Sequence, residues 1–453
     1  MPGYDLIVRD GTLVTEAGVA TSDVGVVDGR IAVMEPELAG DAAVSIDARG
    51  LHLFPGVIDA HVHLNEPGRT GWEGWATGSA ALAAGGATTC FDMPLNAHPP
   101  TVDAASFDAK QAAAEASSVV DFGLWGGLVP GNTKELADLA ARGVVGFKAF
   151  MSRSGTDDFP AADDLTLLDG MAEAARLGLP VAVHAENDAI TAGLAARAVT
   201  AGQITARDYL ASRPAIAEVE AIDRAVLFAE ETGCALHIVH VSTGRGVARV
   251  VAARARGLDV TCETCPHYLV LTEDDLEAIG GRAKCAPPLR PAAEGAALWR
   301  ALMAEEIAFV ASDHSPAPAD LKTGGDVFRI WGGIAGCQST LPLLLTEGHH
   351  TRGMSLPAIA AVLSGAVARR FRLPAKGRLA VGADADLTLV NLGAAWTLTV
   401  DDLRDRHRLS PFVGRSFQGR VVRTLLRGST TFLDGEVIPG SVGRLVRPES
   451  GTR

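Results

Sequence analysis

Residues 54–68 read FPGVIDAHVHLNEPG, and this stretch gives the first indication of the fold. Its run of apolar and β-branched residues is typical of a buried strand. The strand carries two histidines, His61 and His63, which are separated by one residue. Side chains two positions apart on a strand point to the same side. Two imidazoles on one face near the end of a buried strand indicate half of a metal site.

Outward from this stretch, candidate strands alternate with alanine-rich helical segments such as residues 74–86 and 135–143. This alternation predicts a parallel sheet. A doubly wound open sheet would carry a glycine-rich phosphate loop after its first strand, and the sequence has none there. Eight units therefore predict a TIM (β/α)8 barrel. The candidate strands are residues 53–64, 86–94, 119–129, 143–151, 179–187, 234–242, 258–270 and 306–316.

Both chain ends have a different pattern, in which short apolar runs are separated by turn-forming DG pairs. We therefore expect an α/β protein whose barrel carries a small β-sandwich domain built from both ends of the chain. The expected boundaries are residues 1–55 for the N-terminal part of the sandwich, 56–374 for the barrel, 375–441 for the C-terminal part of the sandwich and 442–453 for a loose tail.

Composition narrows the function classes. The formal net charge of −14 argues against a nucleic-acid-binding surface, which needs a basic patch. The first residues lack the basic and apolar regions of a secretory signal, and no apolar run reaches membrane-spanning length. The six cysteines lack the spacing of a disulfide framework. We expect a cytoplasmic protein that binds neither nucleic acid nor membrane.

Four further side chains fall in or just after the candidate strands at the fourth, fifth, sixth and eighth positions. Because the C-terminal ends of barrel strands meet at the mouth, we expect them to converge with His61 and His63. Four imidazoles and one carboxylate suit divalent zinc, with Mn, Co, Ni or Fe as alternatives. A buried ammonium beside metal ions is disfavoured, so the lysine is either neutral or converted into an anionic ligand. In chain order these four residues are Lys148, His184, His240 and Asp313.

This pattern of HxH, Lys, His, His and Asp resembles the binuclear cyclic amidohydrolases, which include dihydroorotase, dihydropyrimidinase (hydantoinase) and allantoinase. The resemblance covers essentially the whole chain. It implies that Lys148 is carbamylated by CO2 and bridges two divalent metal ions per subunit. It also implies a metal-activated water, with Asp313 carrying the proton of that water to the departing ring nitrogen. The implied metal ligands are His61, His63, Lys148, His184, His240 and Asp313.

Within the family, local motifs are similar to those of the allantoinase branch. They include HVHLNEPGRTGWEGW, DMPLNAHPPTVD, SRPAIAEVEAI, TCETCPHY, KCAPPLR, SDHSP, WGGIAGCQS and SPFVGR. Similar dihydroorotases carry an arginine where this chain has Asn65, which cannot replace that charge. Dihydropyrimidinases place a tyrosine shortly after the modified lysine, and the segment KAFMSRSGTDD has none. The resemblance therefore implies hydrolysis of the hydantoin-ring amide of allantoin to allantoate, a step of purine catabolism.

The resemblance also implies contacts to a small cyclic ureide, from side chains and from backbone groups of the loops at the barrel mouth. These residues are Asn96, Cys285, Ala286, Ser315, Gly332 and Gly333. His237 is expected to be a core histidine that faces away from His240. A hydantoinase or dihydropyrimidinase acting on another cyclic ureide is the alternative enzyme. A non-catalytic scaffold is disfavoured because all six ligand positions are filled. A homo-oligomer, a tetramer, is the implied assembly.

Overall fold

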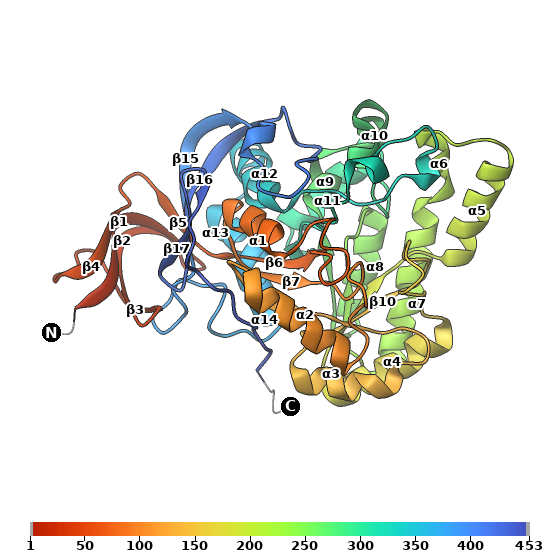
Figure 1. The fold of residues 1–453 in the computed structure, drawn as a ribbon, viewed down its shortest axis with the longest axis horizontal. Helices are drawn as coiled ribbons and strands as arrows, with labels where there is room; N and C mark the ends of the chain where they lie inside the picture. Colours follow the sequence, from red (N-terminus) through yellow and green to blue (C-terminus); the bar gives the residue numbers. More distant parts are fainter. Residues whose placement is uncertain (1–2, 450–453) are drawn as a thin grey trace.

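The computed structural model describes residues 3–449 and has the predicted TIM barrel beside a smaller β-rich part (Figure 1). The barrel strands are parallel and follow one another around the barrel in chain order. They are β6 (Val57–Val62), β7 (Ala87–Asp92), β8 (Asp121–Leu124), β9 (Gly126–Gly127), β10 (Phe147–Phe150), β11 (Val181–His184), β12 (Leu236–Ile238), β13 (Val260–Thr264) and β14 (Phe309–Val310).

Hydrogen bonds at two seams close these strands into a barrel. At the first seam, between β8 and β10, the backbone N–H of Val145 donates to the carbonyl of Leu124 at 2.9 Å. At the second seam, the segment after β14 returns to β6, where Val62 pairs in parallel with His314. The N–H of His63 donates to the carbonyl of His314 at 2.7 Å. The strand ends that carry the predicted site are thus neighbours around one ring.

Helices surround the barrel, and polar residues fix many of their ends. Asp103 caps α2, and its carboxylate accepts the N–H of Ser106 at 2.8 Å. Glycines with left-handed backbone end α4 and α7, where a residue with a Cβ would be strained. None of the helices within residues 3–449 is long and apolar enough to cross a lipid bilayer. The helices are α1 (Trp75–Ala84), α2 (Ala104–Ser117), α3 (Leu136–Arg142), α4 (Asp164–Leu177), α5 (Asp188–Thr200), α6 (Ala206–Ser212), α7 (Ala215–Thr232), α8 (Gly244–Ala255), α9 (Pro266–Val270), α10 (Glu273–Ile279), α11 (Ala292–Met303), α12 (Thr340–Leu343), α13 (Leu356–Ala360) and α14 (Ala366–Arg370).

Aromatic side chains fill the barrel interior below the strand ends. The ring of Phe371, which directly follows α14, packs edge-on against Phe91 at 4.9 Å and Trp125 at 5.3 Å between centroids. Phe309 lies 6.1 Å from the same ring. All four side chains are at most 1% exposed. This packing fills the interior, so a ligand can enter only at the opposite end, where the strands finish.

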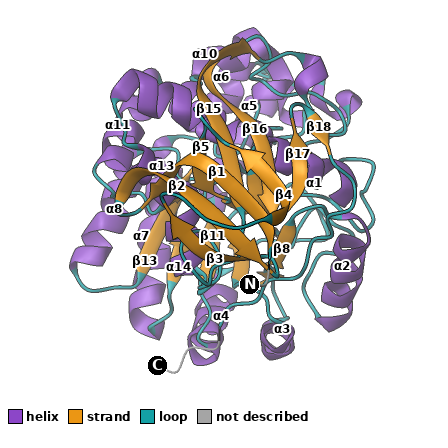
Figure 2. Ribbon diagram, turned by 90° about the vertical axis from the view of Figure 1, so that its left-hand side faces the viewer, coloured by secondary structure: helices purple, strands orange, loops and turns teal. Residues whose placement is uncertain are grey.

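Both chain ends contribute to one nine-stranded sheet, which faces the viewer in Figure 2. The two halves join where β5 pairs antiparallel with β15, with Leu53 opposite Leu389. The chain ends therefore build a single β-rich unit beside the barrel, as their alternating pattern predicts. Its strands are β1 (Tyr4–Thr15), β2 (Gly18–Val27), β3 (Arg30–Glu35), β4 (Ala42–Asp47), β5 (His52–Pro55), β15 (Leu387–Thr397), β16 (Ser416–Leu426), β17 (Ser429–Leu433) and β18 (Glu436–Val437).

Residues 442–449 do not form the expected loose tail. The N–H of Phe122 donates to the carbonyl of Arg444 at 3.0 Å, and the N–H of Val446 donates back to Phe122 at 2.8 Å. Further on, the N–H of Glu449 donates to the carbonyl of Arg372 at 3.0 Å. Polar composition predicted a solvated end, but backbone pairing with β8 overrides composition here. The last four residues of the predicted tail, 450–453, lie outside the described residues.

Candidate active site

The six residues predicted as ligands lie at the C-terminal ends of the barrel strands. Three are on strands β6, β10 and β11, and three follow β6, β12 and β14 within a few residues. When β8 and β9, which are separated by one residue, are counted as one strand, the strand positions are the first, fourth, fifth, sixth and eighth, as the order of the sequence motifs predicted. The residues on strands are His61, Lys148 and His184, and those beyond the strand ends are His63, His240 and Asp313.

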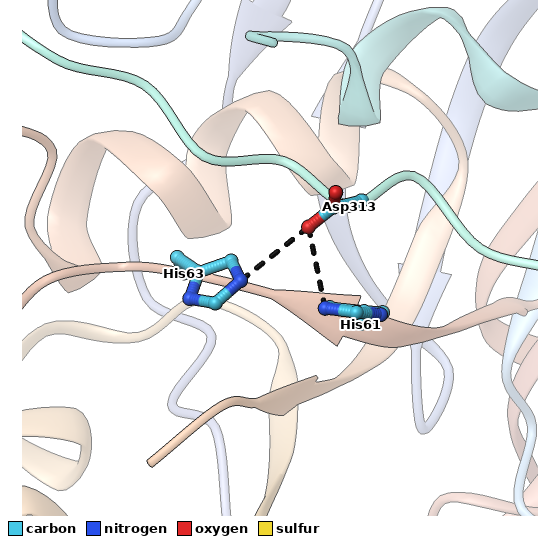
Figure 3. Close-up of side chains that lie close together, drawn as sticks. All are labelled: His61, His63 and Asp313. Carbon is cyan, nitrogen blue, oxygen red and sulfur yellow. Dashed lines mark ion pairs between the residues drawn. The ribbon is translucent and has the colours of Figure 1, made fainter. Parts of the chain in front are cut away.

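Three of these side chains form a compact cluster (Figure 3). Oδ1 of Asp313 lies 3.2 Å from Nε2 of His61 and 3.4 Å from Nε2 of His63. Burial alone would raise the pKa of the Asp313 carboxyl, but the two imidazoles hold it well below its usual value. Asp313 is therefore ionised at neutral pH. One carboxylate oxygen and two ring nitrogens that converge in this way match the donor set of a zinc-type site.

The other two histidines form a second group beside the first. Nδ1 of His184 lies 3.0 Å from Nε2 of His240, and the His240 ring centroid lies 5.5 Å from that of His61. On its other edge, Nε2 of His184 lies 2.8 Å from Oε2 of Glu186, which is ion-paired with Arg213. Because this carboxylate accepts a proton from Nε2, the lone pair of Nδ1 is left facing His240 and the site.

Lys148 interacts electrostatically with both groups, since it lowers the pKa of His184 and His240 and is itself influenced by Asp313. Its Nζ is buried and has no hydrogen-bond partner among residues 3–449. Burial lowers the pKa of Lys148 to about 7, so a neutral amine is accessible near neutral pH. An unpartnered amine among four imidazoles and a carboxylate is an incomplete polar cluster. This donor set fits divalent metal ions.

Sequence reasoning missed Glu263, which supports the cluster from β13. Oε1 of Glu263 lies 2.5 Å from Nδ1 of His61, and Oε2 lies 3.1 Å from Nε2 of His237. Although burial raises the pKa of Glu263, the neighbouring histidines outweigh it and lower the pKa to about 2. One signal was available in the sequence. Glu263 is the single charged residue of VTCET, the part of the candidate strand 258–270 that forms β13.

The expectation that His237 faces away from the site is wrong. Strand alternation assumes that β12 continues through His240, but β12 ends at Ile238 and His240 has a left-handed φ of 39°. His237 therefore points into the barrel, where its ring stacks on Phe309 at 4.8 Å between centroids and reaches Glu263. It remains a core histidine, but one that is linked to His61 through a shared carboxylate.

A cavity of about 370 Å³ opens over the cluster, and five of the six predicted ligands line it, Lys148 excepted. Of the expected substrate-contacting residues, Cys285 is missing from the wall, and its carbonyl accepts the hydroxyl of Tyr209 at 2.8 Å. A larger groove of about 670 Å³ lies along α11, but it has no histidine or carboxylate. The expected substrate-contacting residues that do line the cavity are Asn96, Ala286, Ser315, Gly332 and Gly333.

Several cavity residues were not singled out from the sequence as substrate contacts. Tyr209, Arg213 and Lys284 form part of the wall, and Trp331 lies at the mouth with its ring 4.7 Å from that of Trp72. No spacing rule connects these positions, because α6 and the loops after β13 and β14 bring them together only in the folded chain. Apolar and cationic walls beside a polar floor are typical of a small-molecule site.

Comparison with known proteins identifies the family. The sequence model of the amidohydrolase family matches residues 52–431, which is most of the chain. The chain belongs to the amidohydrolase family. An allantoinase from Rubrobacter xylanophilus is 62% identical over 449 residues, covering 99% of both chains. An allantoinase from Solibacter usitatus is 57% identical over 448 residues, covering 99% of this chain and 98% of that protein.

A solved structure of a similar protein also supports the fold. The L-hydantoinase (dihydropyrimidinase) from Arthrobacter aurescens superimposes with a TM-score of 0.95 at 36% identity, covering 98% of this chain and 100% of its own. The predictions of the family and of a TIM barrel with a β-rich domain are therefore confirmed. Family membership identifies this protein as a hydrolase. The donor set described above is its candidate metal site, which lies at the barrel mouth.

Proposed function

We propose that this protein hydrolyses the hydantoin-ring amide of allantoin and releases allantoate. The observation that carries the proposal is the convergence of four histidines and one aspartate in the wall of a 370 Å³ cavity. Beside it, β10 carries a buried lysine whose amine has no hydrogen-bond partner among residues 3–449. Allantoinases that are 57% and 62% identical over nearly the full chain support the choice of substrate. The reaction adds water across the ring amide, with hydroxyl going to the carbonyl carbon and a proton to the leaving nitrogen.

The metal ligands in this proposal are the residues of the two histidine groups, Asp313 and Lys148. The neutral amine of Lys148 would attack CO2 and lose a proton, which leaves an anionic carbamate in place of a buried cation. Lys148 Nζ, which has no hydrogen-bond partner among residues 3–449, would then be part of a metal-binding group. The carbamate would also remove the repulsion between a buried ammonium and metal ions. Two divalent ions, zinc first and Mn, Co, Ni or Fe otherwise, would polarise the ring carbonyl and acidify the attacking water. The full ligand set is His61, His63, Lys148, His184, His240 and Asp313.

Asp313 is the proton carrier in this scheme. Its carboxylate stays ionised beside His61 and His63, because these imidazoles hold its pKa well below the usual range. It can therefore accept the proton of the attacking water and pass it to the departing ring nitrogen. Asp313 lies in the cavity wall, where both the water and the ring would sit.

Substrate recognition would come from the polar groups of the cavity wall. Asn96 donates through Nδ2 to Oγ of Ser315 at 3.4 Å, while its buried Oδ1 has no partner among residues 3–449. That free oxygen is an acceptor for a ring N–H. Ala286, Gly332 and Gly333 line the same cavity with backbone groups. Cys285 would act only indirectly, because its carbonyl is already bonded to Tyr209.

Turnover of four cyclic substrates by the metal-loaded protein tests this proposal. We expect allantoin to be hydrolysed in preference to hydantoin, dihydrouracil and dihydroorotate. Preference for dihydrouracil or hydantoin would replace allantoinase activity with a hydantoinase or dihydropyrimidinase activity, for which the L-hydantoinase likeness at 36% identity is the supporting observation. A protein that binds two metals per chain and hydrolyses none of the four would refute cyclic-ureide hydrolysis and favour a scaffold. The homotetramer and the cytoplasmic location remain predictions, and sedimentation of the purified protein tests the first.

A further inference from the structure

Two buried lysines lie at or behind the cavity wall, and neither has a carboxylate partner among residues 3–449. Lys322 ends a short helical turn over Ala319–Lys322, in the segment that follows β14, and is 5% exposed. Its Nζ donates to the carbonyl of Trp331 at 2.9 Å and to the carbonyl of Gly333 at 2.6 Å. No ion pair of Lys322 exists within residues 3–449. Burying an amine is costly unless its hydrogen bonds are used. The two backbone carbonyls satisfy Lys322, so Lys322 in turn fixes the position of residues 331 and 333.

Lys284 holds the same segment through two further contacts. Its Nζ donates to the carbonyl of Ile330 and lies 4.5 Å from the centroid of the Tyr209 ring. Its backbone carbonyl accepts the N–H of Gly333 at 2.8 Å. The backbone between Ile330 and Gly333 is therefore fixed by two lysines, which come from the loops after β13 and β14.

One residue between these anchors keeps both of its backbone groups free. Neither the N–H nor the C=O of Gly332 forms a hydrogen bond within residues 3–449, and Gly332 lines the cavity. In a trans peptide plane the N–H points opposite to the C=O. Because Lys322 holds the Trp331 carbonyl, the Gly332 N–H of that plane points away from Lys322. Because Lys284 holds the Gly333 N–H, the Gly332 carbonyl of the next plane points away from Lys284.

We propose that Lys322 and Lys284 are positioning residues that hold the Trp331 carbonyl and the Gly333 N–H, and so orient the Gly332 peptide groups toward the ring amide that they are expected to contact. The inference rests on the proposed function and adds the side chains that keep this expected contact in place. A cyclic amide carries a carbonyl and an N–H, which are complementary to this pair of groups. Burial lowers the pKa of Lys322 to about 7, and both its ammonium and its neutral amine have enough N–H groups for two carbonyls. The device therefore works on either side of neutral pH.

Steady-state kinetics of Lys322→Met test the proposal, with allantoin and with hydantoin, which has the ring but not the ureido tail. Methionine keeps the length of the side chain and removes every donor. We expect KM to rise about tenfold for both substrates, the effect of one lost hydrogen-bonding group. We expect kcat to stay within about threefold, and metal content to be unchanged. Lys134→Met is the matched control, because the Lys134 side chain is 82% exposed and does not belong to the described lining of the cavity.

Two further variants separate positioning from folding. Lys322→Gln keeps N–H donors on a shorter side chain, so its KM should fall between wild type and Lys322→Met. Gly332→Ala should fold, because a Cβ at Gly332 would lie no closer than 3.9 Å to its nearest neighbour. Its methyl group crowds the proposed peptide contact, so KM should rise for both substrates.

The outcomes are distinguishable. A folded Lys322→Met protein with wild-type KM for both substrates overturns the positioning role while leaving the proposed function intact. If neither Lys322 variant folds, an unchanged KM in Gly332→Ala overturns it instead. A rise in KM for allantoin alone would assign the segment to the ureido tail and contradict ring recognition. Wild-type protein without turnover of any cyclic ureide would refute the proposed function, and this inference with it.

Discussion

Oε1 of Glu263 lies 2.5 Å from Nδ1 of His61, at the base of the cavity. The contact fixes the tautomer of His61, because a proton on Nδ1 leaves the lone pair of Nε2 facing Asp313. Glu186 performs the same task for His184, whose Nε2 lies 2.8 Å from Oε2 of Glu186. Carboxylates that orient metal-binding histidines in this way commonly account for part of the metal affinity.

Glu263→Gln should weaken metal binding by about 10- to 100-fold, because the amide is a poorer acceptor for the Nδ1 proton of His61. Metal content after dialysis against a graded series of chelator concentrations measures the effect. Glu231→Gln is the control, since Glu231 is exposed near the end of α7. Unchanged metal retention in Glu263→Gln would show that His61 needs no carboxylate to hold its orientation.

Lys148→Ala should abolish binding of two metals per chain, because it removes the side chain that becomes the bridging anion. Elemental analysis of the purified protein gives the ratio, and the wild-type protein should hold two. Circular dichroism serves as the check on folding, since alanine in β10 removes a buried amine but leaves the strand apolar. Two metals bound to the alanine variant would contradict the bridging role.

Asp313→Asn should keep the fold and lose most turnover. The amide can still offer an oxygen to a metal but cannot accept a proton, so we expect kcat to fall by about 10²- to 10⁴-fold. Metal content measured on the same sample separates loss of the base from loss of the metal. Asp320→Asn, at an exposed position of the same segment, is the control. Near-normal kcat would remove Asp313 as the proton carrier.

Lys322 also predicts a pH dependence of stability. Burial lowers its pKa from the ordinary 10.5 to about 7, so between these values the unfolded chain binds a proton that the folded protein lacks. The free energy of unfolding should therefore rise with pH in this window. Lys322→Met should reduce that slope by up to about 1.4 kcal/mol per pH unit. Urea unfolding between pH 7 and pH 10 measures the slope, which Lys134→Met should not change.

Lys376 lies away from the active site, and we expect its loss to lower the stability of the protein strongly. Its Nζ lies 2.6 Å from Asp121, 3.0 Å from Asp384 and 2.7 Å from Asp386. Burial alone would lower the pKa of Lys376, but the three carboxylates raise it well above its usual value, so it stays charged. The geometry of the three carboxylates would also fit a metal ion, but the Lys376 ammonium already lies among them and Arg427 pairs with Asp121.

Lys376→Met should cost about 3–5 kcal/mol, because within residues 3–449 it removes the only ion-pair partner of the buried Asp386 and one of the two partners of Asp121. Thermal or urea unfolding measures the loss, and KM for allantoin should stay unchanged in protein that remains folded. Lys376→Arg keeps the charge and should recover part of the stability. Wild-type stability in Lys376→Met would mean that water or rearrangement compensates the three aspartates.

The sequence determined the fold class and the six candidate ligands. Strand alternation and helical periodicity are local patterns, and a barrel brings the ends of its strands to one mouth wherever they lie along the chain. His61, Lys148, His184 and the others were therefore recognisable as side chains at strand ends. The direction of His237 was not, because the alternation rule fails where β12 ends at Ile238 and the backbone turns left-handed at His240.

Only the tertiary structure decided which residues support those side chains. Glu263 meets His61 across 202 residues of sequence, and Arg444 and Val446 pair with Phe122 on β8. Lys284 and Lys322 meet at residues 330–333 because two loops pack together at the barrel mouth. No local period links such positions. Their contacts depend on how loops and strand ends pack, so burial and hydrogen bonding in the folded chain decide what sequence spacing cannot.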